Sequence, residues 1–501
     1  PGIFLFLVAF LVMLLEAQRV SERQRRICIA FPIFFLVIML AESYLKVYET
    51  AFFFSLLVAV LYKRKPDERV QEIQEGGKKC WLILSYRANI QGSACSQHLD
   101  DRLPFFQEQG IEPVLLTSTV GERSRWLHYR ALSVAPSGIR FELRHFLRKH
   151  LRRRWQFKLV ETIFLLPVWP FYLLEKIIVN LESEWSWCVL ASLRGTLLCK
   201  QLQPEVIYST GGSASAHVAA LFIKGCTGIK WIAETQDPLV HDRDWRRSKA
   251  VLRLYTFLER KICEQANAFV FLVGAAMEHC RRRTGGVGHT AVVYPGSVPT
   301  LFQEKQQLYS KGECCHFAHF GSLSGTRNLI VFFQALAQIL ADKPELRNHV
   351  QVDVYGSFDG GSEREMEALA LQDLVVCHGP VPRQEAVDAM QQTDCLLLIQ
   401  NIIYFSCETI PSKVYEYLLS GRPIIGLLHN NPELETMLSE NGHYGVPADD
   451  VQATAAAVRQ VLERFTAGEP LVSQASSKVW TAADAVADLV RLAEPSAHPL
   501  R

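Results

Sequence analysis

The chain has 501 residues, of which 49% are hydrophobic and 21% are charged. This length corresponds to about three structural units of roughly 150 residues each, and the composition excludes a globally disordered chain. A formal net charge of only +2 argues against a dedicated nucleic-acid-binding protein. The 13 cysteines include no CxxC pair, which favours reduced thiols in a cytosolic setting over a disulfide framework.

Three nearly continuous apolar segments open the chain, at residues 2–15, 27–41 and 50–62. Each is shorter than the ~20 residues that a spanning helix needs, but flanking residues extend them. Arginines crowd the first connection and a Lys-Arg-Lys run at 63–65 follows the third segment. The positive-inside rule then places the arginine loop and the rest of the chain in the cytoplasm. Residues 1–65 are therefore predicted to span the cytoplasmic membrane, with a signal peptide as the alternative for the first segment.

The remainder alternates short apolar runs with helical patterns, which predicts an α/β fold with parallel sheets. A first Rossmann-like domain is expected over residues 78–283. Its predicted strands are residues 80–86, 112–118, 205–210, 230–234 and 268–273.

Residues 140–179 interrupt this pattern. The stretch 140–158 interleaves Arg and Lys with Phe, Leu and Trp, and a long apolar stretch follows at 163–179. Helices of this composition often lie in the headgroup layer of anionic membranes. We therefore expect this segment to contact membrane lipids. A solvated cationic helix beside a buried one is the alternative, and nucleic-acid binding is a third interpretation.

Two glycine turns of the first domain are candidate binding loops. Gly92 and Ser93 follow the first predicted strand, where a glycine turn lets backbone amides approach a phosphate. Gly211 and Gly212 lie in STGGSASAH (209–217), which turns from a strand into a helix. We assign the first turn to the donor side and the second to the acceptor side of the expected site.

Three polar residues of the same region are further candidates. Glu234 and Asp237 lie at the end of a predicted strand, in IAETQDP (232–238), and are candidate acceptor-side carboxylates. Hydrogen bonding at the strand end is the alternative for both. His217, near the start of an apolar helix, is either an acceptor-side residue or a structural one.

Glycines and prolines at 284–313 predict a linker to a second Rossmann-like domain over residues 314–470. A C-terminal helix and tail are expected at 471–501. The predicted strands of the second domain are residues 316–322, 350–357, 374–379, 394–400 and 422–428.

Two glutamates lie in CETIPSKVYEYLLSGRPIIGLL (407–428). Glu408 is expected in a loop outside the carboxyl end of a parallel strand, where α/β sheets bind ligands. Glu416 is expected in the first turns of the next helix, among apolar neighbours. A capping box from Ser412 would need its glutamate at 415, which is Tyr, so capping does not explain Glu416. A buried carboxylate must find donors, and sugar hydroxyls are suitable ones.

This stretch resembles the signature of retaining glycosyltransferases of the two-domain GT-B fold, family 4, especially members that build bacterial surface polysaccharides. The resemblance covers roughly residues 80–495 and is strong in the second half. It implies that Glu408 contacts the donor sugar and that Glu416 contacts the nucleotide ribose. By position, the residues that line the site between them are Ile410, Pro411, Ser412 and Lys413.

The segment HFGSLSGTRNLIVFFQAL (319–336) resembles the strand, loop and helix that hold the donor diphosphate in that family. A helix N-terminus with cations suits two phosphates. Many members carry an arginine just after the glycine and a lysine a few residues later. Here Ser322 occupies the first place and Arg327 is expected to replace the second. The other residues predicted to face the nucleotide are Gly321, Asn328, Gly356 and Val381.

Together, the apolar segments and the resemblance predict a membrane-anchored glycosyltransferase that moves a sugar from a nucleotide donor, UDP more readily than GDP, onto a lipid-linked saccharide at the cytoplasmic face of the membrane. Its partners would be the nucleotide sugar, this acceptor and membrane lipids, and not nucleic acid. Catalysis is assigned to Glu408, Arg327, Lys413 and Asp237. No cofactor or metal is expected, because the DRD at 242–244 lies in a polar stretch after a proline.

Two alternatives remain open. A GT-B-like sugar-nucleotide epimerase would need no lipid acceptor, so the three apolar segments count against it. A non-catalytic scaffold of a polysaccharide assembly complex is favoured only by Ser322, where many family members carry an arginine.

Overall fold

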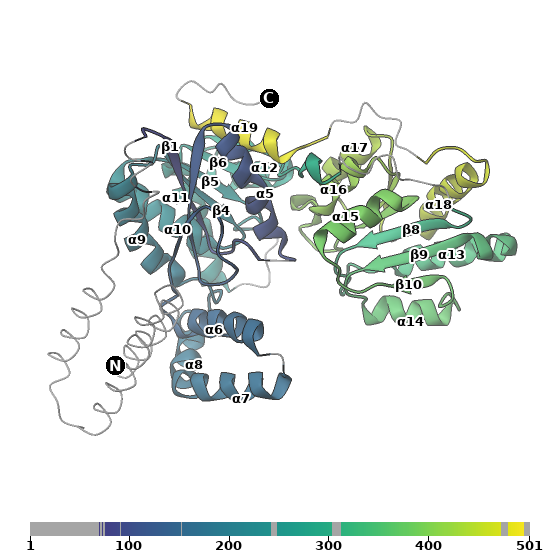
Figure 1. Cartoon of the computed structure of the whole chain (residues 1–501), viewed down its shortest axis with the longest axis horizontal. Coiled ribbons are helices and arrows are strands. Elements are labelled where there is room, and N and C mark those ends of the chain that lie inside the picture. The colour runs from purple at the N-terminus through teal and green to yellow at the C-terminus, as the bar shows by residue number, and fades with distance from the viewer. Residues whose placement is uncertain are drawn as a thin grey trace.

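The computed structural model describes residues 70, 73, 76–90, 92–151, 153–241, 248–302, 312–471 and 479–494. The described chain forms two α/β domains, each built on a parallel sheet, as predicted (Figure 1). The three apolar segments predicted to span the membrane fall within residues 1–69, outside the described residues.

The N-terminal domain contains a seven-stranded sheet in the order β3-β2-β1-β4-β5-β6-β7, parallel throughout. Its strands are buried almost continuously, because helices cover both faces, and this explains the unbroken apolar runs in the sequence. The strands are β1 (Lys79–Ser85), β2 (Ile111–Thr117), β3 (Leu127–Arg130), β4 (Val206–Gly211), β5 (Lys230–Thr235), β6 (Ala268–Phe271) and β7 (Thr290–Val292).

Strand β7 corrects the predicted domain boundary. It pairs with β6, so the first domain extends beyond residue 283 and the linker begins after β7. The predicted C-terminal helix is present as α19 (Ala482–Ala493), and its buried residues Val486 and Leu489 pack in the core of the N-terminal domain. The chain therefore returns to its first domain after completing the second (Figure 1).

The helices that flank the first sheet include α5, which carries residues of the site described below. They are α5 (Ala94–Glu108), α9 (Trp187–Leu202), α10 (Ala214–Thr227), α11 (Lys249–Gln265) and α12 (Gly274–Thr284).

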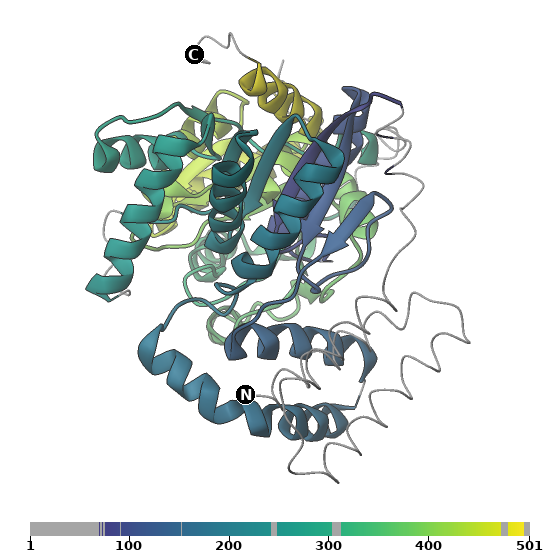
Figure 2. The ribbon, with the colours of Figure 1, turned by 90° about the vertical axis from the view of Figure 1, so that its left-hand side faces the viewer.

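A group of three helices lies apart from both sheets, at one end of the N-terminal domain (Figures 1 and 2). It consists of α6 (Pro136–His150), α7 (Arg154–Leu165) and α8 (Trp169–Ile178), with the short η2 (Leu166–Val168) between the last two. Among the described residues no single helix is both long and apolar enough to cross a bilayer. The pair α7 and α8, bent by 74°, meets that criterion of length and composition when taken together.

The C-terminal domain contains a six-stranded parallel sheet in the order β10-β9-β8-β11-β12-β13. Its strands are β8 (Cys315–Phe320), β9 (Val350–Tyr355), β10 (Val375–Cys377), β11 (Cys395–Ile399), β12 (Ile424–Leu428) and β13 (Tyr444–Pro447). Its helices are α13 (Ile330–Asp342), α14 (Gly360–Ala368), α15 (Arg383–Gln392), α16 (Lys413–Ser420), α17 (Pro432–Ser439) and α18 (Val451–Thr466). The short 3-10 helices are η3 (Pro299–Leu301), η4 (Pro344–His349) and η5 (Ser406–Glu408).

Candidate active site

Glu408 ends η5, which follows the carboxyl end of β11. Its carboxylate is buried, and the imidazoles of two residues of the N-terminal domain donate to it: Nδ1 of His241 to Oε2 and Nδ1 of His279 to Oε1, each at 2.6 Å. The Phe405 ring stacks on His241 at 3.7 Å between centroids. Burial alone raises the pKa of Glu408, but the two hydrogen bonds outweigh it and hold the pKa below its usual range. Glu408 is therefore ionised, and its carboxylate joins the C-terminal domain to two histidines of the N-terminal domain.

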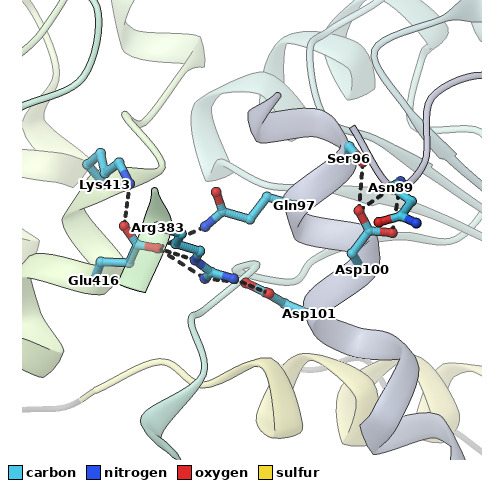
Figure 3. Close-up of polar contacts among 8 residues, drawn as sticks. All are labelled: Asn89, Ser96, Gln97, Asp100, Asp101, Arg383, Lys413 and Glu416. Carbon is cyan, nitrogen blue, oxygen red and sulfur yellow. Dashed lines mark hydrogen bonds and ion pairs between the residues drawn. The ribbon is translucent and has the colours of Figure 1, made fainter. Parts of the chain in front are cut away.

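Glu416 lies one turn into α16, which ends at Gly421, a left-handed residue (φ 68°). Its carboxylate is 2% exposed. Oε1 accepts from Gln97 Nε2 at 2.8 Å and from Arg383 Nε at 3.1 Å, and Oε2 pairs with Lys413 Nζ at 2.5 Å (Figure 3). Burial raises its pKa, and the two cations more than reverse this effect, so the pKa lies below the usual range. The donors that a buried glutamate requires are thus present as protein side chains.

The predicted diphosphate loop follows β8. A Cβ on Gly356 would lie 2.0 Å from the carbonyl oxygen of Gly321, so two backbones approach here too closely for any side chain. Near Gly321, the buried Nε2 of His319 and the Nε of Arg327 have no hydrogen-bond partner among the described residues. Burial, with Arg327 and Lys413 nearby, lowers the pKa of His319 to about 4. Because Nδ1 of the neutral His319 ring donates to the carbonyl oxygen of Leu397 at 3.0 Å, its Nε2 is an acceptor. The unpartnered Nε of Arg327 is therefore the buried donor that an anion could use here.

Other residues predicted for the donor side have mixed environments. Ile410 lies between the domains and packs against the cores of both. Ser322 is exposed, and Asn328 joins its own turn by donating to the carbonyl of Gly325 at 2.9 Å. Val381 packs against the C-terminal core. Pro411 and Ser412 are half-buried just before α16, while Gly92 is exposed and Ser93 is half-buried just before α5.

On the acceptor side, Asp237 is an exposed residue, although protein atoms surround its carboxylate. A Cβ on Gly212 would lie 3.2 Å from Asp237 Oδ2, so the glycine leaves room for this carboxylate. Burial of the carboxylate is the main reason that its pKa is raised, and the nearby His241 and Arg87 oppose this shift. Gly211 (φ 119°) ends β4 beside it. Because His241 also binds Glu408, Asp237 and Glu408 face the same region from opposite domains.

Two predicted acceptor-side residues are structural instead, which corrects the sequence-based assignment. Glu234 is fully buried and pairs with Arg102 Nη1 at 2.5 Å, while the Thr210 hydroxyl donates to it at 2.7 Å. His217 is also fully buried, with Nδ1 2.9 Å from the Ser209 hydroxyl. Both side chains lie inside the N-terminal domain rather than at the surface.

Sequence reasoning missed five residues of this site: Gln97, Asp101, His241, His279 and Arg383. His241 lies a few residues past the end of β5 and Arg383 just past the HGP turn at 378–380, so both follow strand ends where ligand residues are expected. Nothing in the sequence distinguishes His279, Gln97 or Asp101 from ordinary helix residues. Among the described residues, no group of three or more His, Cys, Asp or Glu side chains is placed to hold a metal ion.

The chain is similar to known proteins in the sequence of its C-terminal domain and in its overall fold. Residues 314–464 match the family described as "Glycosyl transferases group 1". A search of curated protein sequences finds no significant match. Solved structures resemble the chain at low identity: sucrose-phosphate synthase from Thermosynechococcus elongatus (13% identity, TM-score 0.55, covering 83% of this chain and 98% of that one) and HepE from Anabaena with UDP-glucose (14%, 0.52, 82% and 98%).

A third similar structure is an α,α-trehalose-phosphate synthase (UDP-forming) from Burkholderia xenovorans in complex with glucose-6-phosphate (11% identity, TM-score 0.55, covering 83% of this chain and 99% of that one). These likenesses show the GT-B fold. Together with the family match over the C-terminal domain, they identify the chain as a glycosyltransferase.

Proposed function

We propose that this enzyme transfers a hexosyl group, with retention of configuration, from a nucleoside diphosphate sugar to a lipid-linked saccharide at the cytoplasmic face of a membrane. The observation that carries the proposal is the pair of buried carboxylates, Glu408 and Glu416, in a domain that also holds Arg327, whose buried Nε has no hydrogen-bond partner among the described residues. UDP is favoured over GDP because the similar HepE and trehalose-phosphate synthase are described with UDP-glucose and as UDP-forming.

In this proposal the protein acts by positioning and by charge. Glu408 orients the donor sugar, Glu416 holds the ribose, and Arg327 with Lys413 stabilises the departing diphosphate. The departing phosphate oxygen accepts the proton of the acceptor hydroxyl, and Asp237 orients that hydroxyl. No step requires a metal, so full activity is expected in the presence of a chelator.

The ribose assignment gives the direct test. Glu416→Ala is expected to weaken UDP binding by about 10- to 150-fold, since charge-assisted hydrogen bonds of this kind contribute roughly 1.5–3 kcal/mol. Isothermal titration calorimetry with UDP measures this loss. Inorganic diphosphate serves as the matched ligand because it has no ribose, and its affinity should not fall. Glu408→Ala should leave UDP affinity nearly unchanged and lower turnover instead. Unchanged UDP binding in Glu416→Ala would contradict the ribose assignment.

The three-helix group α6–α8 is the proposed membrane-contacting surface. Helix α8 has no buried residue and α7 has one, Leu165. Large apolar side chains are therefore exposed: Trp155, Leu159, Ile163, Phe164, Leu166, Trp169, Phe171, Leu173, Leu174, Ile177 and Ile178. Exposed cations lie beside them: Arg148, Lys149, Arg153, Arg154 and Lys158. A large apolar surface next to cations suits the headgroup layer of an anionic bilayer.

A chain that begins at Lys78 is therefore expected to bind vesicles containing phosphatidylserine and to be released by high salt. Changing Arg148, Lys149, Arg153 and Arg154 to Gln should remove most of this binding, at about 1 kcal/mol per cation. Vesicle flotation measures it. The matched control changes Lys343, Arg347, Arg459 and Arg464 of the C-terminal domain to Gln. If the two substituted proteins float with the vesicles to the same extent, helices α6–α8 do not bind lipid through their charge.

A further inference from the structure

Arg383 lies between a carboxylate of each domain. Its Nη1 and Nη2 bind the two oxygens of Asp101, on α5 of the N-terminal domain, at 2.6 and 2.7 Å. Its Nε binds Glu416, on α16 of the C-terminal domain, at 3.1 Å (Figure 3). A paired, planar guanidinium of this kind fixes the direction as well as the distance of its partners.

The two carboxylates are largely shielded from water, and the arginine between them is half-buried. The side chain of Arg383 is 31% exposed, that of Asp101 12% and that of Glu416 2%. Charge-assisted hydrogen bonds in such surroundings are screened less by solvent and salt than surface ion pairs are. The chain of contacts from Asp101 through Arg383 to Glu416 therefore links the two domains at the carboxylate that we assign to the ribose.

The burial of Glu416 indicates which of its hydrogen-bond partners a ribose hydroxyl would displace. Since its carboxylate is almost fully enclosed, a ribose hydroxyl reaches it only by replacing a partner. Arg383 and Lys413 are charged partners, whose loss would leave a buried charge uncompensated. Gln97 is the neutral partner, at 2.8 Å, and a hydroxyl replaces an amide donor without that penalty. The exchange removes one contact between the domains and leaves the contact of Arg383 with Asp101 in place.

We propose that Arg383 is a positioning residue that couples the contact between the two domains to the nucleotide site. Asp101 anchors Arg383 from the N-terminal domain, Arg383 orients Glu416 toward the ribose, and the ribose takes the place of Gln97. The inference rests on the proposed function through the ribose assignment of Glu416. It adds that a nucleotide bound to the C-terminal domain is sensed by α5 of the other domain.

Hydrogen exchange of the full chain, with and without UDP, tests this coupling. UDP should slow exchange in α15 and α16. It should also slow exchange in α5, because a Glu416 fixed by the ribose holds Arg383 against Asp101, which we expect to outweigh the loss of the Gln97 contact. In Asp101→Asn, UDP should still bind within about 3-fold of the original affinity, because Arg383 keeps its bond to Glu416. Its protection of α5 should fall by about 10-fold, however, because the interdomain anchor is lost. Asp101→Glu should restore much of this protection.

Asp100 offers a matched control on the same helix. Its carboxylate accepts from the Ser96 hydroxyl at 2.7 Å and from the backbone N–H of Asn89 at 2.9 Å, both within the N-terminal domain (Figure 3). Asp100→Asn removes the same charge without touching Arg383, so UDP should still protect α5. Equal protection of α5 in the original protein and in Asp101→Asn would overturn the inference.

Failure of the proposed function gives a different result. If UDP does not bind the original protein, the donor assignment fails. The coupling is then judged on the protein without UDP, where Asp101→Asn, and not Asp100→Asn, should speed exchange in α5 and α15 by several-fold. Equal rates in the two variants would overturn the inference in that case too.

Discussion

Arg327→Ala is expected to lower turnover by about 10²–10³-fold, the loss that follows removal of one preorganised donor to a developing negative charge. The buried Nε of Arg327 has no hydrogen-bond partner among the described residues, and burial lowers the pKa of this side chain. A partly buried cation without a partner is unfavourable unless an anion is bound to it. An anion at this position, such as the leaving diphosphate, would remove that penalty.

The same reasoning predicts that folding stability does not fall in Arg327→Ala, because the buried Nε makes no hydrogen bond that the substitution would remove. Initial rates of UDP release, measured with the donor sugar and acceptor lipid, give the turnover, and thermal unfolding gives the stability. Arg347→Ala is the control, since this arginine pairs with Asp373 at the surface and should affect neither quantity strongly. A normal rate in Arg327→Ala would move the phosphate site elsewhere.

Most strands that sequence reasoning found are longer and more buried than those it missed, although the three-residue β10 was also found. The runs at β1, β4 and β11 are five to seven residues long and buried almost throughout, so their apolar pattern is unambiguous. Strands β3, β7 and β13 have only three or four residues, most of them half-buried. Such short segments lack a pattern that separates them from loops. The position of β7 explains why the predicted linker began too early.

The residues of the site also divide into those that the sequence predicted and those that only the structure shows. The placement of Glu408 and Glu416 followed from a local signature, whereas His241, His279 and Gln97, which bind them, come from the other domain. His241 lies 167 residues from Glu408 in the sequence, and Gln97 lies 319 residues from Glu416. No local pattern encodes such pairs. Glu234 and Asp237 illustrate the same point, because only tertiary structure shows that the first faces Arg102 in the core.

Arg102→Met is expected to destabilise the folded chain by about 3–5 kcal/mol, the largest stability effect that we predict. Arg102 and Glu234 are both fully buried and form an ion pair at 2.5 Å. Arg102 also donates to the Tyr208 hydroxyl at 2.9 Å. Removing the cation leaves the Glu234 carboxylate ionised without its main partner, or forces it to take up a proton, and either outcome costs free energy. Urea unfolding followed by tryptophan fluorescence measures the change.

The double variant Arg102→Met, Glu234→Leu separates this role from a catalytic one. Replacing both members of a buried pair with apolar groups of similar size is often neutral or stabilising, so the double variant should recover most of the lost stability. Because Glu234 lies in the core, the recovered protein should also bind UDP and turn over normally. Loss of turnover in a stable double variant would restore Glu234 as an acceptor-side residue, and a double variant as unstable as Arg102→Met would contradict the ion-pair explanation. Glu234→Leu alone leaves the arginine unpaired and should be destabilising as well, which completes the cycle that isolates the energy of the pair.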